Sequence, residues 1–172
     1  MGILPTVAAQ QSFDVTTGVD LQEVENAVNQ ALREIAQRYD FKDSKCVIEL
    51  DRNNALVRLE ADDSFRMKAL LEILKARFVK RGVPLKNVNP GEDQPAGAGR
   101  VRKQIALTQG ISGDTARAIL KAFKAEKFKK VQMAIQGDQL RVSSASRDAL
   151  QDIMSFLKGQ DFGIELDFGN YR

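Results

Sequence analysis

The side chains best suited to chemistry lie on a predicted strand, tight turn and return strand between residues 131 and 143, VQMAIQGDQLRVS. Apolar and polar residues alternate on both sides of residues 137–138, a glycine–aspartate pair typical of a two-residue hairpin loop. The polar face carries Gln132, Gln136 and Arg141. Amides offer paired donors and acceptors that suit base edges, and a guanidinium can grip a phosphate or a guanine edge. The pattern favours a binding surface over an active site, and a plain solvated or covered sheet face is the structural alternative.

A second electropositive segment follows residue 116 and combines one arginine with five lysines: Arg117, Lys121, Lys124, Lys127, Lys129 and Lys130. The first three share a stripe on a predicted helix, and the others crowd its end. Such a stripe can contact a nucleic-acid backbone. A solvated helix face is the alternative, because cations near a helix C-terminus also suit the helix dipole.

The sequence gives no support for catalysis. It has no histidine, which excludes histidine-based triads and histidine-ligated zinc sites, and it has neither a GxxxxGK[ST] phosphate loop nor a GxGxxG motif after a strand. A serine–lysine arrangement stays open. Cys46 is the only cysteine and is expected to be a buried structural thiol in a strand. We therefore expect no enzyme activity, no metal and no cofactor, and the absence of an internal disulfide favours a reducing cytoplasm.

The composition is that of a soluble globular protein, with 172 residues, 43% hydrophobic and 28% charged. No apolar run approaches the ~18 residues of a membrane span, and residues 1–11 lack the basic start and apolar run of a signal peptide. Residues 1–95 hold 13 basic and 15 acidic side chains, whereas residues 96–172 hold 13 basic and 8 acidic ones. An anionic ligand is therefore expected in the second half.

Apolar residues recur at every second position in some stretches and at every third or fourth position in others. These strand-like and helix-like patterns occur in the same order twice along the chain. Strands are expected at 12–17, 46–51, 55–61 and 83–88, with helices from residue 20 to about 39 and from 64 to 82. The second series has strands at 100–108, 131–136, 139–143 and 163–168, a helix capped by Ser112 or Asp114, and a helix from Ser146 to about Gly159. Prolines and glycines at 89–99 predict a linker. The expected domains are 12–88 and 100–172.

This order indicates an α+β fold built from two split βαβ units, each an antiparallel sheet backed by two helices. One face of each sheet would be open, and open sheets of this kind commonly bind nucleic acid. Such sheets usually stack bases on aromatic side chains, but the predicted strands ALVRLEA and QLRVSS contain none. A conventional RNA-recognition domain is therefore disfavoured.

The chain resembles the YajQ-like family of bacterial nucleotide-binding proteins. The matching stretches are SFDV, VDLQEVENAV, RYDFKDSK, FVKRG, KQIALTQGIS, KVQMAIQGDQLRVSS and SRDALQ, which together cover nearly the whole chain from Ser12 to Arg172. The resemblance implies two tandem ferredoxin-like, RNA-recognition-type βαββαβ units that can exchange their C-terminal strands with each other. It also implies nucleotide or RNA binding and, for some members, service as a cyclic di-GMP effector.

The matched motifs supply six candidate nucleotide-binding residues: Lys42, Lys103, Gln104, Gln136, Arg141 and Arg147. The first hypothesis is a non-enzymatic nucleotide-binding protein, in which Arg141→Ala weakens binding and leaves the melting temperature nearly unchanged. The second is an RNA- or tRNA-binding module that uses the basic helix. The third is an adaptor that docks a transcription factor. The oligomeric state stays open.

Overall fold

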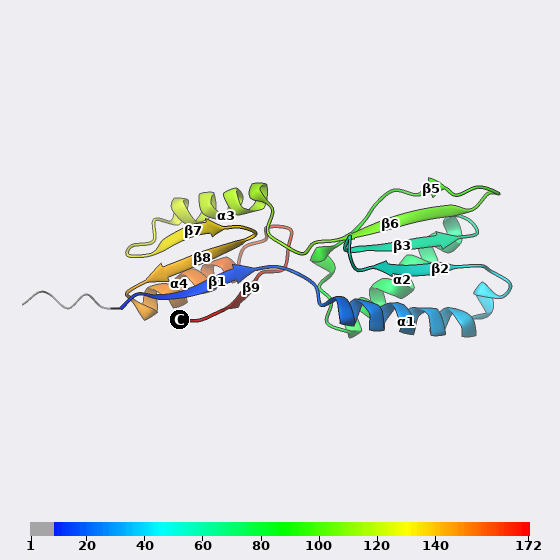
Figure 1. Ribbon diagram of the computed structural model, residues 1–172, viewed down its shortest axis with the longest axis horizontal. Helices are drawn as coiled ribbons and strands as arrows, with labels where there is room; N and C mark the ends of the chain where they lie inside the picture. Colours follow the sequence, from blue (N-terminus) through cyan, green and yellow to red (C-terminus); the bar gives the residue numbers. More distant parts are fainter. Residues whose placement is uncertain (1–8) are drawn as a thin grey trace, which may run out of the picture. The chain divides into compact units, whose positions relative to one another are not determined.

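The computed structural model of the chain describes residues 9–172, so the expectation about a signal peptide lies, for residues 1–8, outside the described residues. Strands and helices follow one another as expected for an α+β chain (Figure 1). In chain order they are β1 (Gln11–Thr16), α1 (Leu21–Gln37), β2 (Val47–Asp51), β3 (Leu56–Ala61), α2 (Ser64–Lys80), β4 (Val88–Pro90), β5 (Gln94–Pro95), β6 (Val101–Leu107), α3 (Gly113–Glu126), β7 (Gln132–Gln136), β8 (Gln139–Ser144), α4 (Arg147–Lys158) and β9 (Asp167–Gly169), with short 3₁₀ turns η1 (Tyr39–Phe41) and η2 (Leu85–Asn87). None of the helices in residues 9–172 has the length and hydropathy that a membrane crossing needs.

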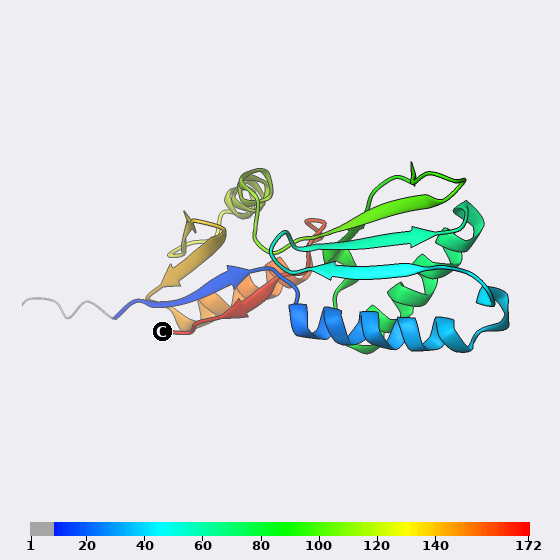
Figure 2. The same cartoon turned by 45° about the vertical axis from the view of Figure 1, so that its right-hand side comes forward.

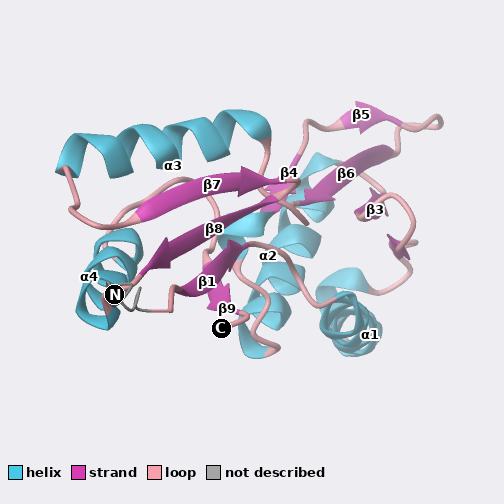
Figure 3. Cartoon of the chain, turned by 60° about the vertical axis from the view of Figure 1, so that its left-hand side comes forward, coloured by secondary structure: helices cyan, strands magenta, loops and turns pink. Residues whose placement is uncertain are grey.

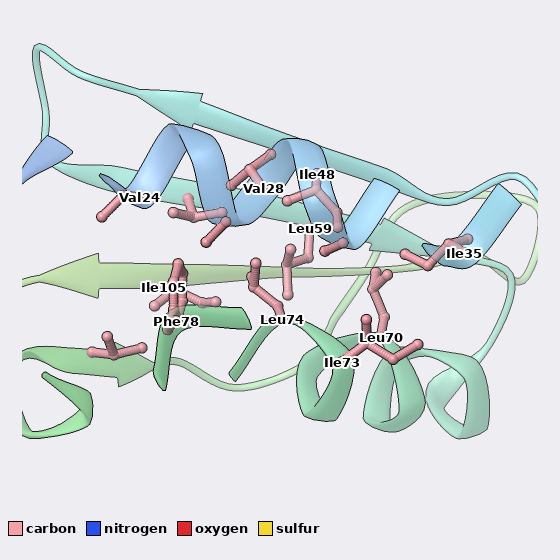
Figure 4. Close-up of a cluster of buried hydrophobic side chains, with 14 of the residues drawn as sticks. Val24, Val28, Ile35, Ile48, Leu59, Leu70, Ile73, Leu74, Phe78 and Ile105 are labelled. Carbon is pink, nitrogen blue, oxygen red and sulfur yellow. The ribbon is translucent and has the colours of Figure 1, made fainter. Parts of the chain in front are cut away.

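The first compact unit comprises residues 18–109. Its antiparallel sheet has the order β2-β3-β6-β4, with β5 also paired to β6, and α1 and α2 cover one face (Figure 2). Alternate residues of β3 are buried, as period two requires when one face is covered. The core joins both helices to four strands, and Val24, Leu74, Leu59 and Ile105 are among its residues (Figure 4). Burial of this apolar layer is the main stabilising contribution to the unit.

The second unit joins the described residues up to Thr17 to Gly110–Arg172. Its antiparallel sheet has the order β7-β8-β1-β9, and its core combines β1, α3, β8 and α4. Phe13 and Val15 of β1 are fully buried there, opposite Val142 and Leu140 of β8. The two sheets and their helix pairs confirm the predicted α+β fold of tandem βαββαβ units.

The domain boundaries differ from the predicted division into 12–88 and 100–172, because the leading strands of the two repeats exchange places. β1 pairs with β8 and β9, and β6 pairs with β3 and β4. The C-terminal strands β4 and β9, in contrast, stay with the helices of their own repeats. Both leading strands are short and alternating, so periodicity places residues on a face but does not choose the sheet.

The segment predicted as a linker at 89–99 is part of the first sheet. Val88–Pro90 and Gln94–Pro95 both pair with β6. Between them, residues 91–93 face only residues 103–104 of β6, which makes a bulge in which Gly91 still donates to the carbonyl oxygen of Gln104 at 2.8 Å. The strand predicted at 83–88 is wrong, because η2 occupies Leu85–Asn87 behind Pro84 and pairing begins only at Val88. Proline lacks an amide hydrogen and is tolerated at an edge, which is where both prolines of this segment lie.

Helix boundaries agree closely with the capping residues in the sequence. The side chains of Asp20, Ser112 and Ser146 accept hydrogen bonds from backbone amides in the first turns of α1, α3 and α4. Asp63 does the same for α2, which begins at Ser64 as predicted. Gly82 follows α2 with a φ of 73°, the left-handed conformation that a glycine adopts without steric cost.

Strand exchange also removes the predicted charge asymmetry. Residues 18–109 hold 16 basic and 14 acidic side chains, and residues 9–17 with 110–172 hold 10 basic and 9 acidic ones. Arg100, Arg102 and Lys103 belong to the first unit, and Asp14 belongs to the second. Net charge therefore does not select a unit for an anionic ligand, and the choice depends on local geometry.

Candidate functional site

The six predicted binding residues are divided between the two units. Lys42, Lys103 and Gln104 belong to residues 18–109, whereas Gln136, Arg141 and Arg147 belong to the unit completed by β1. Lys42 is exposed directly after η1. Within the second unit, Gln136 and Arg141 lie on the open face of the sheet, while Arg147 opens α4 on the other side. These six residues therefore do not form one continuous surface of a single sheet.

Lys103 and Gln104 are neighbours on β6 and point to opposite faces. The Lys103 amine lies 3.1 Å from a carboxylate oxygen of Asp93 and donates to the carbonyl oxygen of Gly91 at 2.9 Å. This side chain therefore holds the bulged segment between β4 and β5. Gln104 is exposed and lines a hollow of about 220 Å³ that also contains Glu92 and no cationic side chain. The hollow offers little to a phosphate.

Arg141 forms an ion pair with Asp14 of the same unit. Its Nε donates to Asp14 Oδ1 at 3.0 Å, and the amide of Asn170 donates to Asp14 Oδ2 at 3.0 Å. Asp14 is 1% exposed, although its parity places it on the open face. The Arg141 hydrogen bond holds the pKa of Asp14 below its usual value against the opposing effect of burial. The charge of Arg141 is thus paired within the protein, and its Nε–H, one of five guanidinium donors, is used by that pair.

A β-bulge after β9 places Asn170 against Asp14. Asp14 lies opposite Gly169, but Ser12 and Arg172 exchange two backbone hydrogen bonds of 3.1 and 3.0 Å. One residue of β1 thus faces two residues of the C-terminal segment, and Asn170 has the positive φ, 52°, typical of such bulges. The bulge keeps the final residues paired to the start of β1.

The most suitable ligand site is a cavity of about 310 Å³ in the second unit, which we call the α4 cavity. Phe13 and Leu150 are buried at its floor, and Met154 extends this apolar surface. Tyr171, a residue that is 66% exposed, also lines the cavity, and its ring centroid lies 6.3 Å from that of Phe13. The remaining lining residues are Gln11, Ser12, Arg147, Gln151 and Arg172. An apolar floor with a few polar groups at the rim is the usual composition of a small-molecule site.

The charges at the α4 cavity favour an anion. Arg147 and Arg172 are exposed, and no carboxylate side chain is among the residues that line the cavity. Ser146 caps the helix, and this fixes Arg147 in the first turn of α4. Guanidinium groups bind phosphate oxygens through two parallel hydrogen bonds, and an exposed ring can stack on a base. The cavity thus combines the two interactions that a nucleotide requires.

Of the lining residues, the sequence predicted only Arg147. Tyr171 and Arg172 follow the last strand, where no periodicity assigns them a face, and Gln11 precedes the first expected strand. Pairing of Ser12 with Arg172 brings the two ends of the described chain together. An aromatic residue beside an arginine at the chain end was the one signal in the sequence.

Two other side chains with possible chemical roles, Cys46 and Asp62, lie in environments that suit a structural role. Cys46 is half-buried immediately before β2, outside the strand in which it was predicted, and burial raises the pKa of its thiol. Asp62 accepts from Ser44 at 2.6 Å and from Arg100 at 2.6 Å, and these bonds lower the pKa of its carboxyl. Within residues 9–172, no group of three or more potential ligand side chains could hold a metal ion.

The basic helix is α3, and its lysines are exposed as predicted. Lys121 and Lys124 lie on the helix, and Lys127 follows it with a left-handed φ of 54°. Arg117 forms an ion pair with Asp114 one turn earlier. This surface is the second candidate for contacts with phosphates.

The fold defines a class of small protein built from two α+β units, each an antiparallel sheet with two helices. The family model described as "Nucleotide-binding protein YajQ-like" matches residues 11–172, and the chain belongs to this family. It is 44% identical to a nucleotide-binding protein of Koribacter versatilis over 95% of this chain and 98% of the relative. It is 47% identical to a nucleotide-binding protein of Geotalea uraniireducens over 94% of this chain and 98% of the relative. A nucleotide-binding protein of Carboxydothermus hydrogenoformans is 45% identical over 96% of this chain and all of its own length.

Proposed function

We propose that this chain is a nucleotide-binding protein without catalytic activity and that its ligand occupies the α4 cavity. The observation that carries the proposal is the combination of an exposed ring, Tyr171, with two arginines over an apolar floor. Family membership supports the ligand class, because the similar proteins are named nucleotide-binding proteins. Arg147 is the predicted site residue that the proposal retains as a primary contact.

Within this proposal the ligand is cyclic di-GMP and the protein is its effector in the cytoplasm. Two phosphodiesters match the two guanidinium groups of Arg147 and Arg172, and a guanine base can stack on Tyr171. A cavity of about 310 Å³ is at the low end for ligand sites, so part of a dinucleotide would lie outside it. The family resemblance supports this choice of ligand.

The proposal is tested by isothermal titration of the purified protein with cyclic di-GMP, GTP and a short single-stranded RNA at two salt concentrations. Tyr171→Ala removes a stacking platform worth about 1–3 kcal/mol per base, a loss of roughly 5- to 150-fold in affinity. Arg147→Ala removes charge-assisted hydrogen bonds worth about 1.5–3 kcal/mol. Saturable dinucleotide binding that both substitutions weaken is the expected result.

Two controls locate the site. Arg102→Ala removes an exposed arginine from β6 in the first unit and should leave affinity unchanged. Gln136→Ala probes the open sheet face, the alternative site that Gln136 and Arg141 would serve. If Gln136→Ala abolishes binding while Arg147→Ala and Tyr171→Ala do not, the ligand lies on the open face and the α4 cavity assignment is wrong.

A second candidate function is RNA or tRNA binding by α3. Its support is the exposed series of lysines on and after that helix, among them Lys121, Lys124 and Lys129. Affinity for single-stranded RNA would then fall with salt, with a log–log slope of about −0.7 for each phosphate contacted. Lys121→Glu combined with Lys124→Glu should abolish it. Lack of binding to all three ligands would instead favour the adaptor function, with a transcription factor as partner.

A further inference from the structure

Strand β7 is the unprotected edge among the four sheet edges of the described residues. Natural edges are usually blunted by charges, prolines, bulges or short length. In the first unit, β2 carries Glu49 and Asp51, and the opposite edge is interrupted and carries Pro90 and Pro95. In the second unit, β9 has three residues and is followed by the bulge at Asn170. Figure 3 shows β7 as the outermost strand of its sheet, next to β8, and its sequence QMAIQ contains none of these protective features.

The pairing of β7 with β8 determines which residues of β7 point their backbone N–H and C=O groups toward the free edge. β7 and β8 are joined by a two-residue loop, and Gln136 lies opposite Gln139 across it. Residues that flank a two-residue loop form a hydrogen-bonded pair, and such pairs alternate along an antiparallel ladder. Gln136, Ala134 and Gln132 therefore bond to β8. Met133 and Ile135 direct their N–H and C=O groups toward the free edge.

The side chains of β7 leave apolar surface uncovered at this edge. Met133 and Ile135 have the parity of the buried residues Val142 and Leu140 and so face the helices. Ile135 is nevertheless 43% exposed, and Met133 is only half-buried. No charged residue lies within β7 itself. This helix-facing surface lacks a neighbouring strand to complete it.

Charges flank β7 with opposite signs at its two ends. Lys130 precedes the strand, and Asp138 lies in the loop that follows it; both are exposed. In an antiparallel pair of identical strands, the start of one strand meets the end of the other. A two-fold axis at Ala134 places Lys130 of each copy opposite Asp138 of the other copy. The same register pairs Met133 with Ile135 of the second copy and matches their free backbone groups.

We propose that β7 is the docking surface for a second copy of this chain, in a two-fold dimer with antiparallel β7 strands and Ala134 at the axis. Each sheet then continues into the other, and the exposed side of Ile135 is covered. Moving the register by one residue pair in either direction loses the match between Lys130 and Asp138. One short strand from each copy makes a small interface, so the dimer is weak and concentration-dependent.

Disulfide trapping tests the register directly. Across the axis, Ala134 forms a non-hydrogen-bonded pair with itself, with Cα atoms about 4.5 Å apart, which is within the range that a disulfide spans. Ala134→Cys in a Cys46→Ser background should form a covalent dimer under mild oxidation. Gln132→Cys in the same background is the matched control. Its Cα would lie about 13 Å from the equivalent atom of the second copy, beyond disulfide reach.

Charge reversal and light scattering supply an independent readout. The mass of the wild-type protein should rise from 19.1 kDa toward twice that value with concentration. Lys130→Glu and Asp138→Lys should each raise the concentration needed by about ten-fold, and the combined variant should recover dimerisation. A monomeric mass at all concentrations, or equal cross-linking of the Ala134→Cys and Gln132→Cys variants, would overturn the proposal.

Discussion

Replacing Arg141 is expected to lower the stability of the folded protein. The sequence alone predicted a nearly unchanged melting temperature. Arg141→Ala leaves Asp14, which is 1% exposed, with the amide of Asn170 as its remaining side-chain donor. Removing one partner of a buried ion pair costs about 3–5 kcal/mol. Because the Arg141 side chain is 28% exposed and water can enter its place, we expect a loss of about 2–3 kcal/mol in the free energy of unfolding at pH 7.

The pH dependence gives this prediction a distinct signature. The pKa of Asp14 is lowered in the folded protein, so the pair stabilises fully above the unfolded value of about 3.9, and this contribution is lost as pH falls through the folded pKa. The difference between wild type and Arg141→Ala, measured by urea unfolding, should therefore be largest near neutral pH and shrink below about pH 4.

A double-mutant cycle separates the ion pair from other effects of the substitution. In an Asp14→Asn background the buried charge is gone, so Arg141→Ala should cost less than half of what it costs in the wild type. Arg102→Ala, an exposed arginine on a strand of the other sheet, should change stability by less than about 0.5 kcal/mol. The reasoning is refuted if Arg141→Ala matches Arg102→Ala, or if its cost is the same at pH 7 and pH 3.

Three further predictions follow from the fold. The fragment 18–109 should show a cooperative urea transition by circular dichroism, whereas the fragment 100–172, which lacks β1 and its buried Phe13, should not. Ser146→Ala removes the cap of α4 and should lower the unfolding free energy by about 1 kcal/mol, with Ser155→Ala on the exposed side of the same helix as a neutral comparison. Because burial raises the pKa of Cys46, its alkylation at pH 8 should be slower than that of a free thiol and should reach the same rate in urea; equal rates in the native protein would contradict its assigned environment.

Local structure was predictable because each element carries its own signal. Capping side chains and apolar stripes predicted α1 and α4, and the glycine–aspartate loop predicted the β7–β8 hairpin. The partner of a strand depends on contacts distant in sequence, and β1 and β6 both alternate in a way that suits either sheet. The exchange of leading strands was therefore outside the reach of periodicity. The charge asymmetry inferred from the two halves was lost with it.

The sequence also could not show which charged side chains pair with one another in the folded protein. Arg141 looked available for a ligand because the sequence does not show that Asp14 lies beside it, 127 positions away. Lys103 likewise looked free until the bulge at Gly91 and Asp93 was visible. Both residues hold parts of the fold together, so their residue type alone did not distinguish binding from structural roles. Arg147 is an exposed cation, and its role in binding stays a prediction, whereas its neighbours in the cavity were not predicted.

Strand exchange is what assembles the α4 cavity. Phe13 on β1 supplies part of its floor, Leu150 on α4 supplies the rest, and Tyr171 and Arg172 reach it because the C-terminal segment pairs with Ser12. If β1 stayed beside the helices of its own repeat, the cavity would lose its floor and the strand that anchors Tyr171. Ligand binding at this site and stability of the exchanged strand are thus coupled, since a ligand that contacts both segments binds only the form in which they are paired. A nucleotide that fills the α4 cavity should therefore raise the unfolding free energy of the unit that contains the cavity and leave the isolated fragment 18–109 unaffected.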